Sequence, residues 1–435
     1  MKNRAWTYVS TFSAAAATLG LGAIYGILAA RLLGPVARGE LAVLIYFPTL
    51  IGCFGPLAVP QALTYRVSRS PGTAAEDVTA GTRIAFGLSL LSCCCFFFLS
   101  PLFLGGSSKG LASAVKWACV GAPAMVVNPH VYAMQRGLGR FDRVNALMVT
   151  AAAGNLLGLG ALWLSGNVSP LSLVGAQLVV QTLVAVANLC GLRELEWLGA
   201  VRPQAYWSCL RQGLWFFPPV AAFLVFTNVD RAILIRTTTL EQIGYYTVAM
   251  ALATPMMSIA LELFGNVMFV EVAGQTSVGS QADLVVRRFH LAQIVLASGA
   301  FVICLLADPL IRLAFGSKFV PAISVVRLLA WTMCARGLSV ALDHSLRARN
   351  RPWPGTTANC LGFAALVCSA WFASRGAFSF ALLQLVAQSV VFAALIFLAS
   401  RSFGIRAFSW WGLKPSSVRA ATASAAILWR GARKA

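Results

Sequence analysis

The sequence predicts an all-α polytopic membrane protein with about twelve transmembrane helices, on the basis of its composition and its apolar runs. The chain of 435 residues is 59% hydrophobic and only 11% charged, with a mean hydropathy of +0.77. Soluble domains carry about a quarter charged residues. A helix needs about 20 apolar residues to cross a hydrocarbon core about 30 Å thick, and continuous runs of this length favour helices over alternating barrel strands.

That length divides the chain into spans at 7–30, 41–65, 82–104, 113–134, 144–164, 168–190, 213–235, 244–270, 289–307, 320–343, 356–374 and 377–400. The first two spans are joined by AARLLGPVARGELAVL, where Gly34-Pro35 and Gly39-Glu40 are expected to form a short charged turn. The chain is therefore expected to cross the bilayer, reverse and cross back.

Prolines interrupt two of these spans at corresponding places. Pro48, Pro56 and Pro60 lie in the second span, and Pro255 lies in the eighth. Interrupted helices at matching positions of two halves indicate a transport path, so these prolines are gating or hinge candidates. Proline is also common in membrane helices in general, which leaves the ordinary interpretation open.

The domain organisation follows from the longest connector, residues 191–212. It separates an N-terminal six-helix lobe, 1–190, from a C-terminal six-helix lobe, 213–400. The basic, Trp-containing tail, 401–435, is expected to be cytoplasmic, either on anionic lipid as an amphipathic segment or disordered.

An internal repeat indicates that the chain is built from two similar halves. Arg31 and Gly39 recur as Arg236 and Gly244 after 205 residues, and QRGLGR from residue 135 is followed by LRARNR 211 residues later. Six helices return the chain to its starting side, so this parallel repeat predicts two lobes related by an axis along the membrane normal.

The net charge of +21 is explained by the positive-inside rule. Of the 34 Lys and Arg residues, 23 fall on one side of the expected spans and nine on the other, which places both termini in the cytoplasm. These residues occur singly between apolar runs rather than as a binding stripe, so nucleic acid is not an expected partner.

Nothing in the sequence predicts an enzyme. The eleven cysteines lie mostly inside apolar runs without ligand spacing. No nucleophile with a base and no phosphate-binding glycine loop is evident. We therefore expect no metal, no cofactor and no catalytic residue.

Three stretches resemble a known family: ARLLGPVARGELA after the first span, NVDRAILIRTTTLEQIGYYTVAMAL across the seventh and eighth, and AFGSKFVPA before the tenth. They are similar to the polysaccharide flippases, the O-antigen and exopolysaccharide exporters of the multidrug/oligosaccharidyl-lipid/polysaccharide superfamily. The resemblance covers nearly the whole chain. It implies a MATE-like V-shaped cavity between two lobes.

The same resemblance implies a function and a location. The expected activity is flipping of an undecaprenyl-diphosphate-linked oligosaccharide across the bacterial inner membrane during polysaccharide or lipopolysaccharide biosynthesis. The implied partners are that lipid-linked oligosaccharide, membrane lipids, and a polysaccharide polymerase with its chain-length machinery.

Arginines near or within the spans are the first candidates for binding a diphosphate, because a guanidinium offers paired donors to phosphate oxygens. A charge at the bilayer centre costs about 2.5–3.5 kcal/mol and usually faces a cavity or a partner. The candidates are Arg66, Arg231, Arg327 and Arg336. The alternatives are a positive-inside anchor for Arg66, a salt bridge with Asp230 for Arg231, and snorkelling or packing for the other two.

Neutral and acidic side chains complete the candidate site. Gln61 precedes Arg66 in VPQALTYR, and Gln177 and Gln181 share one helix face. Their amides suit either sugar hydroxyls or hydrogen bonds between helices. Glu262 in the eighth span is the ion-coupling candidate, or a partner for an arginine.

Two alternative functions stay open. A cation-coupled multidrug exporter of the same superfamily should carry buried carboxylates in its first half, and none is expected deep within the first six spans. A membrane-embedded glycan polymerase or glycosyltransferase should carry a large outer loop, whereas the outer loops expected here are short.

Overall fold

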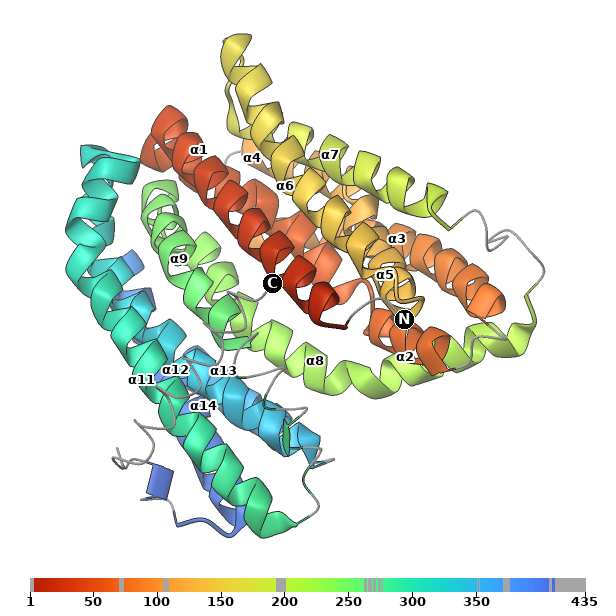
Figure 1. Ribbon diagram of the computed structural model, residues 1–435. Helices are drawn as coiled ribbons and strands as arrows, with labels where there is room; N and C mark the ends of the chain where they lie inside the picture. Colours follow the sequence, from red (N-terminus) through yellow and green to blue (C-terminus); the bar gives the residue numbers. More distant parts are fainter. Residues whose placement is uncertain are drawn as a thin grey trace. The chain divides into compact units, whose positions relative to one another are not determined.

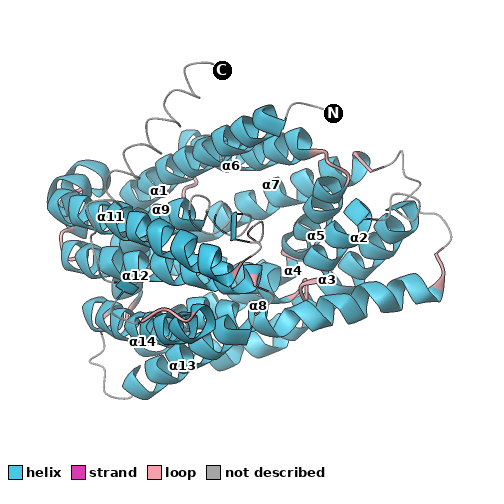
Figure 2. Cartoon of the chain, turned by 60° about the horizontal axis from the view of Figure 1, so that its bottom comes forward, coloured by secondary structure: helices cyan, strands magenta, loops and turns pink. Residues whose placement is uncertain are grey.

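Every regular element in the described part of the protein is a helix, as the computed structural model shows (Figure 2). The described residues are 4–69, 74–104, 109–192, 201–261, 277–349, 353–370 and 376–406, with the single residues 264, 268, 271, 272, 275, 351, 409 and 410. The main helices are α1 (Arg4–Phe54), α2 (Val59–Arg69), α3 (Ala74–Leu104), α4 (Lys109–Val120), α5 (Pro123–Gly137), α6 (Phe141–Leu164), α7 (Pro170–Cys190), α8 (Pro203–Thr237), α9 (Leu240–Ala260), α11 (Val278–Leu310), α12 (Ala322–Ala348), α13 (Trp353–Ala370) and α14 (Ala377–Phe403).

Contacts between helices divide the chain into two compact units. The first comprises residues 1–248 and 313–319, and the second comprises 249–312 and 320–435. In the first unit α1 packs along α6, α6 packs on α7, and α2 and α3 pack against α5 and α8 (Figure 1). The lobe boundary expected at residues 191–212 stays a prediction.

The second unit is organised around α12. Helices α11 and α14 pack against α12, and α13 packs against α14. Of the most apolar 18-residue window of α12, 78% is buried, the highest share among the candidate spans. A helix enclosed in this way reads as apolar on nearly all faces, so its few polar residues need partners inside the unit.

Nine helical stretches in the described residues are long and apolar enough to cross a membrane, so the chain is a multi-pass membrane protein. About twelve spans were expected. The first stretch, Ser13–Phe54, covers the first expected span and much of the second, while α9 and α13, which lie on two further expected spans, are not among the nine. The difference between nine and twelve therefore arises because the first stretch merges two expected spans and because α9 and α13 are not counted.

The expected turn between the first two spans is a single kink. Helix α1 contains two helices joined at Gly34, whose φ of 73° and ψ of 177° lie outside the helical region. Glycine reaches this backbone conformation without the steric penalty of a Cβ. The prediction of a longer turn that includes Gly39 and Glu40 was wrong, because both residues are helical.

Local sequence signals fix several helix ends. The Ser169 hydroxyl accepts a hydrogen bond from the Ser172 amide, and the Ser169 amide donates one to the Ser172 hydroxyl, which makes a capping box; Pro170 follows at the first helical position of α7. Helix α14 ends where Gly404 adopts a left-handed conformation with φ of 68°.

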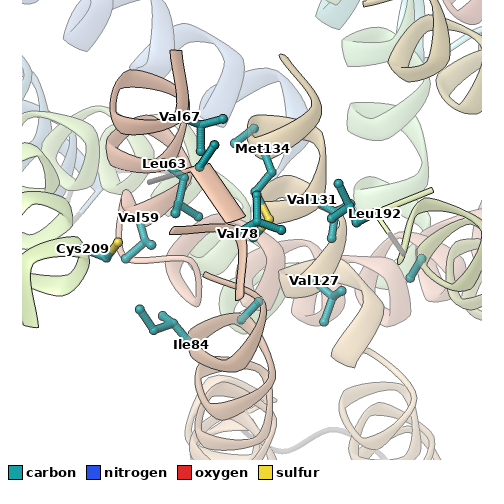
Figure 3. Close-up of a cluster of buried hydrophobic side chains, with 14 of the residues drawn as sticks. Val59, Leu63, Val67, Val78, Ile84, Val127, Val131, Met134, Leu192 and Cys209 are labelled. Atoms are coloured by element: carbon teal, nitrogen blue, oxygen red, sulfur yellow. The ribbon is translucent and has the colours of Figure 1, made fainter. Parts of the chain in front are cut away.

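A cluster of buried apolar side chains holds α2 in the first unit (Figure 3). Val59, Leu63 and Val67 recur every fourth residue on one face of α2. They pack against residues of α3, α5 and α8, among them Val78 and Met134. This one-sided packing leaves the opposite face of α2 available for other contacts.

Gly213 in α8 lies against this cluster, so a substitution there tests how closely the cluster is packed. A Cβ added at Gly213 would lie 3.0 Å from the Val59 Cα and 3.1 Å from its amide nitrogen, and these backbone atoms cannot easily move aside. We expect Gly213→Ala to lower the free energy of unfolding by about 1–3 kcal/mol through overpacking. The measurement is thermal unfolding in detergent.

The matched control is Gly87→Ala in α3, where an added Cβ meets nothing within 4 Å. This variant should keep the melting temperature or raise it slightly, because alanine favours a helix over glycine. Equal melting temperatures for the two variants would contradict the close contact at Gly213.

Candidate functional site

A pocket of about 400 Å³ opens in the first unit between the end of α1, α2, α5 and α8. This volume lies in the usual range for sites that bind small molecules. Its polar lining residues are Gln61, Thr64, Tyr132 and Arg136, and the rest of the lining is mainly proline, alanine and other apolar residues. The pocket therefore combines an apolar wall with a few hydrogen-bonding groups.

The pocket exists because the second expected span is broken. Helix α1 stops at Phe54 and α2 starts at Val59, and between them Leu57 and Ala58 have φ values of 50° and 56°. Non-glycine residues in this left-handed region store strain of order 1–3 kcal/mol each, and such strain clusters at functional sites. Pro56 lies in the break itself and lines the pocket.

The predicted hinge prolines differ in their places. Pro48 lies inside α1, whereas Pro56 and Pro60 both line the pocket. Pro255 lies inside α9. The structure thus brings two of the four prolines to one site, while their role in motion stays a prediction.

One face of α2 packs in the apolar cluster, and the other face lines the pocket. Val59 and Leu63 face the apolar cluster, and Gln61 and Thr64 face the pocket. The Thr64 hydroxyl lies 3.1 Å from the carbonyl oxygens of Pro60 and Ala133, so its proton is already used. Gln61 is exposed and keeps its amide available to a ligand.

Arg136 supplies the positive charge of the pocket. It is exposed, and within the described residues it donates to the Met148 sulfur at 4.0 Å, a weak acceptor, and makes no ion pair. No carboxylate is among the described lining residues. An isolated guanidinium beside an apolar wall favours an anion with an apolar part. Arg136 was expected only as a cytoplasmic charge, although its repeat with Arg347 marked the position.

Arg66 lies on α2 but pairs with α3. Its guanidinium donates to Asp77 Oδ1 at 2.6 and 2.9 Å, and Asp77 is 1% exposed. Burial lowers the pKa of Arg66, but its hydrogen bonds to Asp77 and the nearby charges of Asp77 and Glu76 together raise that pKa, so the group stays charged. The pair ties α2 to α3, and a substrate role for Arg66 stays a prediction.

A second ion pair fixes the start of α8 to the same end of α3. Arg202 donates to both carboxylate oxygens of Glu76, at 3.0 and 2.7 Å. These hydrogen bonds raise the pKa of the exposed Arg202 guanidinium. Surface pairs of this kind contribute little stability individually, so we assign this one to orientation of the helix end.

Gln181 lies in a hydrogen-bond network between α5 and α7. Asn128 donates to the side-chain oxygen of Gln181 at 3.1 Å, and Asn188 donates to Asn128 at 3.3 Å. This arrangement matches the interhelical interpretation. Gln177, one turn before Gln181, has a buried side-chain oxygen without a hydrogen-bond partner among the described residues.

Asp230 and Arg231 do not form a side-chain salt bridge. Asp230 is 2% exposed and accepts from the Tyr246 hydroxyl at 2.6 Å and from the Arg231 amide at 2.8 Å. The side chain of Arg231 is half-buried and lies close enough to Tyr46 and Cys53 for an electrostatic interaction. Cys53 lines the pocket, so Arg231 is near its edge.

The remaining candidates lie in the second unit or outside the described residues. Arg336 is 6% exposed and donates to Gln388 at 3.2 Å, and Gln388 donates to Ser339 at 3.0 Å. Arg327 is exposed and donates to the Cys304 carbonyl at 3.4 Å. Glu262 lies outside the described residues.

Arg38 was expected to be a loop charge between the first two spans, and its burial was not predicted. The residue is helical, 8% exposed and adjacent in space to Tyr25. Its Nε and the Tyr25 hydroxyl are both buried without hydrogen-bond partners among the described residues, and Arg38 forms no ion pair there. A buried cation without a counter-ion among the described residues is costly, so Arg38 is a candidate for a functional role.

Known proteins resemble this chain in sequence and in fold. The profile described as "Polysaccharide biosynthesis protein" matches residues 4–269. No curated protein matches significantly. Among solved structures, the lipid II flippase MurJ in an inward closed conformation superposes with a TM-score of 0.75 at 13% identity, covering 96% of this chain and 92% of that one.

Two other structures show the same fold. An inward-facing multidrug resistance MATE transporter gives a TM-score of 0.68 at 13% identity, over 87% of this chain and 95% of that one. A transporter of the same superfamily from Pyrococcus furiosus gives 0.63 at 14% identity, over 92% and 95%. At these identities the comparison establishes the fold alone.

The strained break before α2 generates a stability prediction. Because Ala58 has φ of 56°, Ala58→Gly removes a steric penalty of about 1 kcal/mol that offsets the entropy cost of glycine. We expect an unchanged or slightly higher melting temperature. The control is Ala62→Gly inside α2, which should lower the free energy of unfolding by about 1 kcal/mol. A comparable loss in both variants would contradict the strained backbone.

Arg38 generates a second prediction. Replacing this buried cation, which has no counter-ion among the described residues, with an apolar side chain of similar length should stabilise the protein, by less than the about 3 kcal/mol that a charge at the bilayer centre costs. We expect Arg38→Met to raise the melting temperature in detergent, and Arg38→Lys to leave it nearly unchanged. A lower melting temperature for Arg38→Met would show that the guanidinium has a structural role instead.

Proposed function

The chain belongs to the polysaccharide biosynthesis protein family, and we propose that it flips an undecaprenyl-diphosphate-linked oligosaccharide across the bacterial inner membrane by alternating access. Transporters of this superfamily and fold generally do not act as enzymes. The proposal concerns the substrate, its direction of movement and the residues that bind it.

The observation that carries the proposal is the single guanidinium in the α2 pocket. Arg136 provides donors for a diphosphate, Gln61 provides an amide for sugar hydroxyls, and the apolar wall suits the prenyl chain. The lack of a carboxylate in the described lining favours this anion over a cationic drug. Arg231 at the pocket edge and Arg38 along α1 are further candidates for contact with the diphosphate.

The pocket is proposed to receive the substrate from the cytoplasmic leaflet. The distribution of basic residues places Arg136 and the ion pairs of Arg66 and Arg202 on the cytoplasmic side. Binding there, followed by opening to the other side, moves the headgroup without breaking a covalent bond. Polymerase and chain-length machinery are proposed partners that would use the flipped product.

The experiment measures translocation of a fluorescent undecaprenyl-diphosphate oligosaccharide in proteoliposomes. Hydrogen bonds to charged groups contribute about 1.5–3 kcal/mol, so Arg136→Gln should slow translocation roughly ten- to a hundredfold. Arg136→Lys should retain part of the rate, because a lysine keeps the charge but loses the paired donors.

The control is Arg211→Gln, which removes an exposed arginine of α8 that does not line the pocket. This variant should keep the wild-type rate. Equal rates for Arg136→Gln and wild type would remove Arg136 from the site. Absence of glycan movement together with efflux of small cations would replace the flippase with a multidrug exporter.

A further inference from the structure

The kink in α1 brings two polar side chains together. Gly34 joins two helices within α1, with Tyr25 in the first and Arg38 in the second. Thirteen residues separate these two positions, which would lie about 20 Å apart on one straight helix. Their side chains are nevertheless close enough for an electrostatic interaction. The helix after the kink therefore returns along the helix before it and carries Arg38 toward Tyr25.

Both side chains are hydrogen-bond donors that lack an acceptor. Arg38 is 8% exposed, and its Nε is buried without a hydrogen-bond partner in the described part of the chain. The hydroxyl of Tyr25 is buried and unpartnered there as well. A guanidinium can only donate, and a phenol has one proton to donate. The group that would satisfy both side chains is therefore an acceptor of two hydrogen bonds.

This missing acceptor should carry a negative charge. Among the described residues no carboxylate forms an ion pair with Arg38, and Glu40, two residues further on, forms none with it either. Arg31, before the kink, does find acceptors, since its guanidinium donates to the carbonyl oxygens of Leu313 and Ala314. A buried cation is costly until a counter-charge accompanies it, so an anion stabilises this place more than a neutral acceptor does.

The other half of the repeat has an acid at the corresponding place. The offset of 205 residues that relates Arg31 to Arg236 also relates Tyr25 to Asp230. Asp230 is 2% exposed and accepts from the Tyr246 hydroxyl at 2.6 Å. The buried pair in α8 and α9 thus joins a donor to an anion, whereas the buried pair in α1 joins two donors. An anion bound between them would complete the pair in α1.

We propose that Tyr25 and Arg38 form a binding site for a small inorganic anion, with chloride as the expected occupant. The Arg38 Nε–H and the Tyr25 O–H donate to the ion, and its charge compensates that of the guanidinium. Because both donor atoms are enclosed, the site admits a single-atom ion more readily than a diphosphate headgroup. Water is the competing occupant, since it also accepts two hydrogen bonds but brings no charge.

The test measures the melting temperature of the full-length protein in detergent while chloride replaces gluconate at constant ionic strength. An ion that binds only the folded protein stabilises it by mass action. We expect the wild type to melt about 2 °C higher once chloride exceeds its Kd about tenfold, and the rise to saturate. Excess broadening of the chloride NMR signal reports binding directly. The gain in stability expected of Arg38→Met should be largest in gluconate.

Three variants change the site and one leaves it intact. Tyr25→Phe deletes one donor and should raise the chloride concentration at half-response about tenfold. Arg38→Gln should abolish the response. Tyr25→Glu supplies the kind of carboxylate that Asp230 provides in the other half, so its melting temperature should not depend on chloride. The control is Arg211→Gln, which removes an exposed arginine of α8 and should keep the wild-type response.

Two results would overturn the site. A wild type whose melting temperature and NMR signal do not respond to chloride would leave water as the occupant. An equal response in wild type and Arg38→Gln would place the ion elsewhere. If Arg38→Gln does not fold, Tyr25→Phe decides, and a half-response at the wild-type chloride concentration would refute the site. These measurements involve no lipid-linked glycan, so their outcome is independent of the proposed transport.

Discussion

A peptide group in the hydrocarbon core must find its hydrogen-bond partner inside the protein, and the whole architecture depends on this requirement. Continuous helices meet it without help from neighbours. The chain departs from a helix between Phe54 and Val59, and there α2 is enclosed by α3, α5 and α8. Irregular backbone at membrane depth is tolerated where protein or a water-filled cavity covers it. Helices α5 and α8 cover the broken backbone and also line the pocket, so the pocket lies where the helix is broken.

Buried charged groups also need hydrogen-bond partners inside the protein. Asp230 is held by the Tyr246 hydroxyl, Asp77 by Arg66, and Arg336 donates to Gln388. Each of these groups replaces lost water with a directed hydrogen bond, which limits the cost of burial. The buried Arg38 departs from that pattern, and the exposed Arg136 likewise has no ion pair among the described residues. A conformational cycle that presents them to an anionic headgroup would give both charges a partner.

Hydropathy predicted most helices because long apolar runs in lipid admit few structures. The expected span 168–190 agrees closely with α7, Pro170–Cys190. Hydropathy could not predict the break in the span 41–65, because Leu57 and Ala58 are not residues that favour a left-handed backbone. Pro56 indicated an interruption of the helix, but it did not indicate the strained backbone at Leu57 and Ala58.

The candidate site was less predictable than the fold. Arg66 was chosen because it lies at the cytoplasmic end of the second expected span, but its hydrogen bond to Asp77 depends on how α2 packs on α3. Arg136 was overlooked because a cytoplasmic arginine satisfies the positive-inside rule without further explanation. Depth along a span can be counted from the sequence, whereas the direction of a side chain and its partner depend on packing between helices.

The repeat predicted from the sequence has a parallel in two hydrogen-bonded glutamines. QLVVQ from residue 177 and QLVAQ from residue 384 stand at corresponding places in α7 and α14. In the first unit Gln181 accepts from Asn128, and in the second Gln388 accepts from Arg336. Residues 128 and 336 are 208 apart, and 181 and 388 are 207 apart. The glutamine of each pair is the same, while its donor is an amide in one copy and a guanidinium in the other. A glutamine oxygen accepts from either donor, so the second unit carries a charge at this place while the hydrogen bond between its helices is kept.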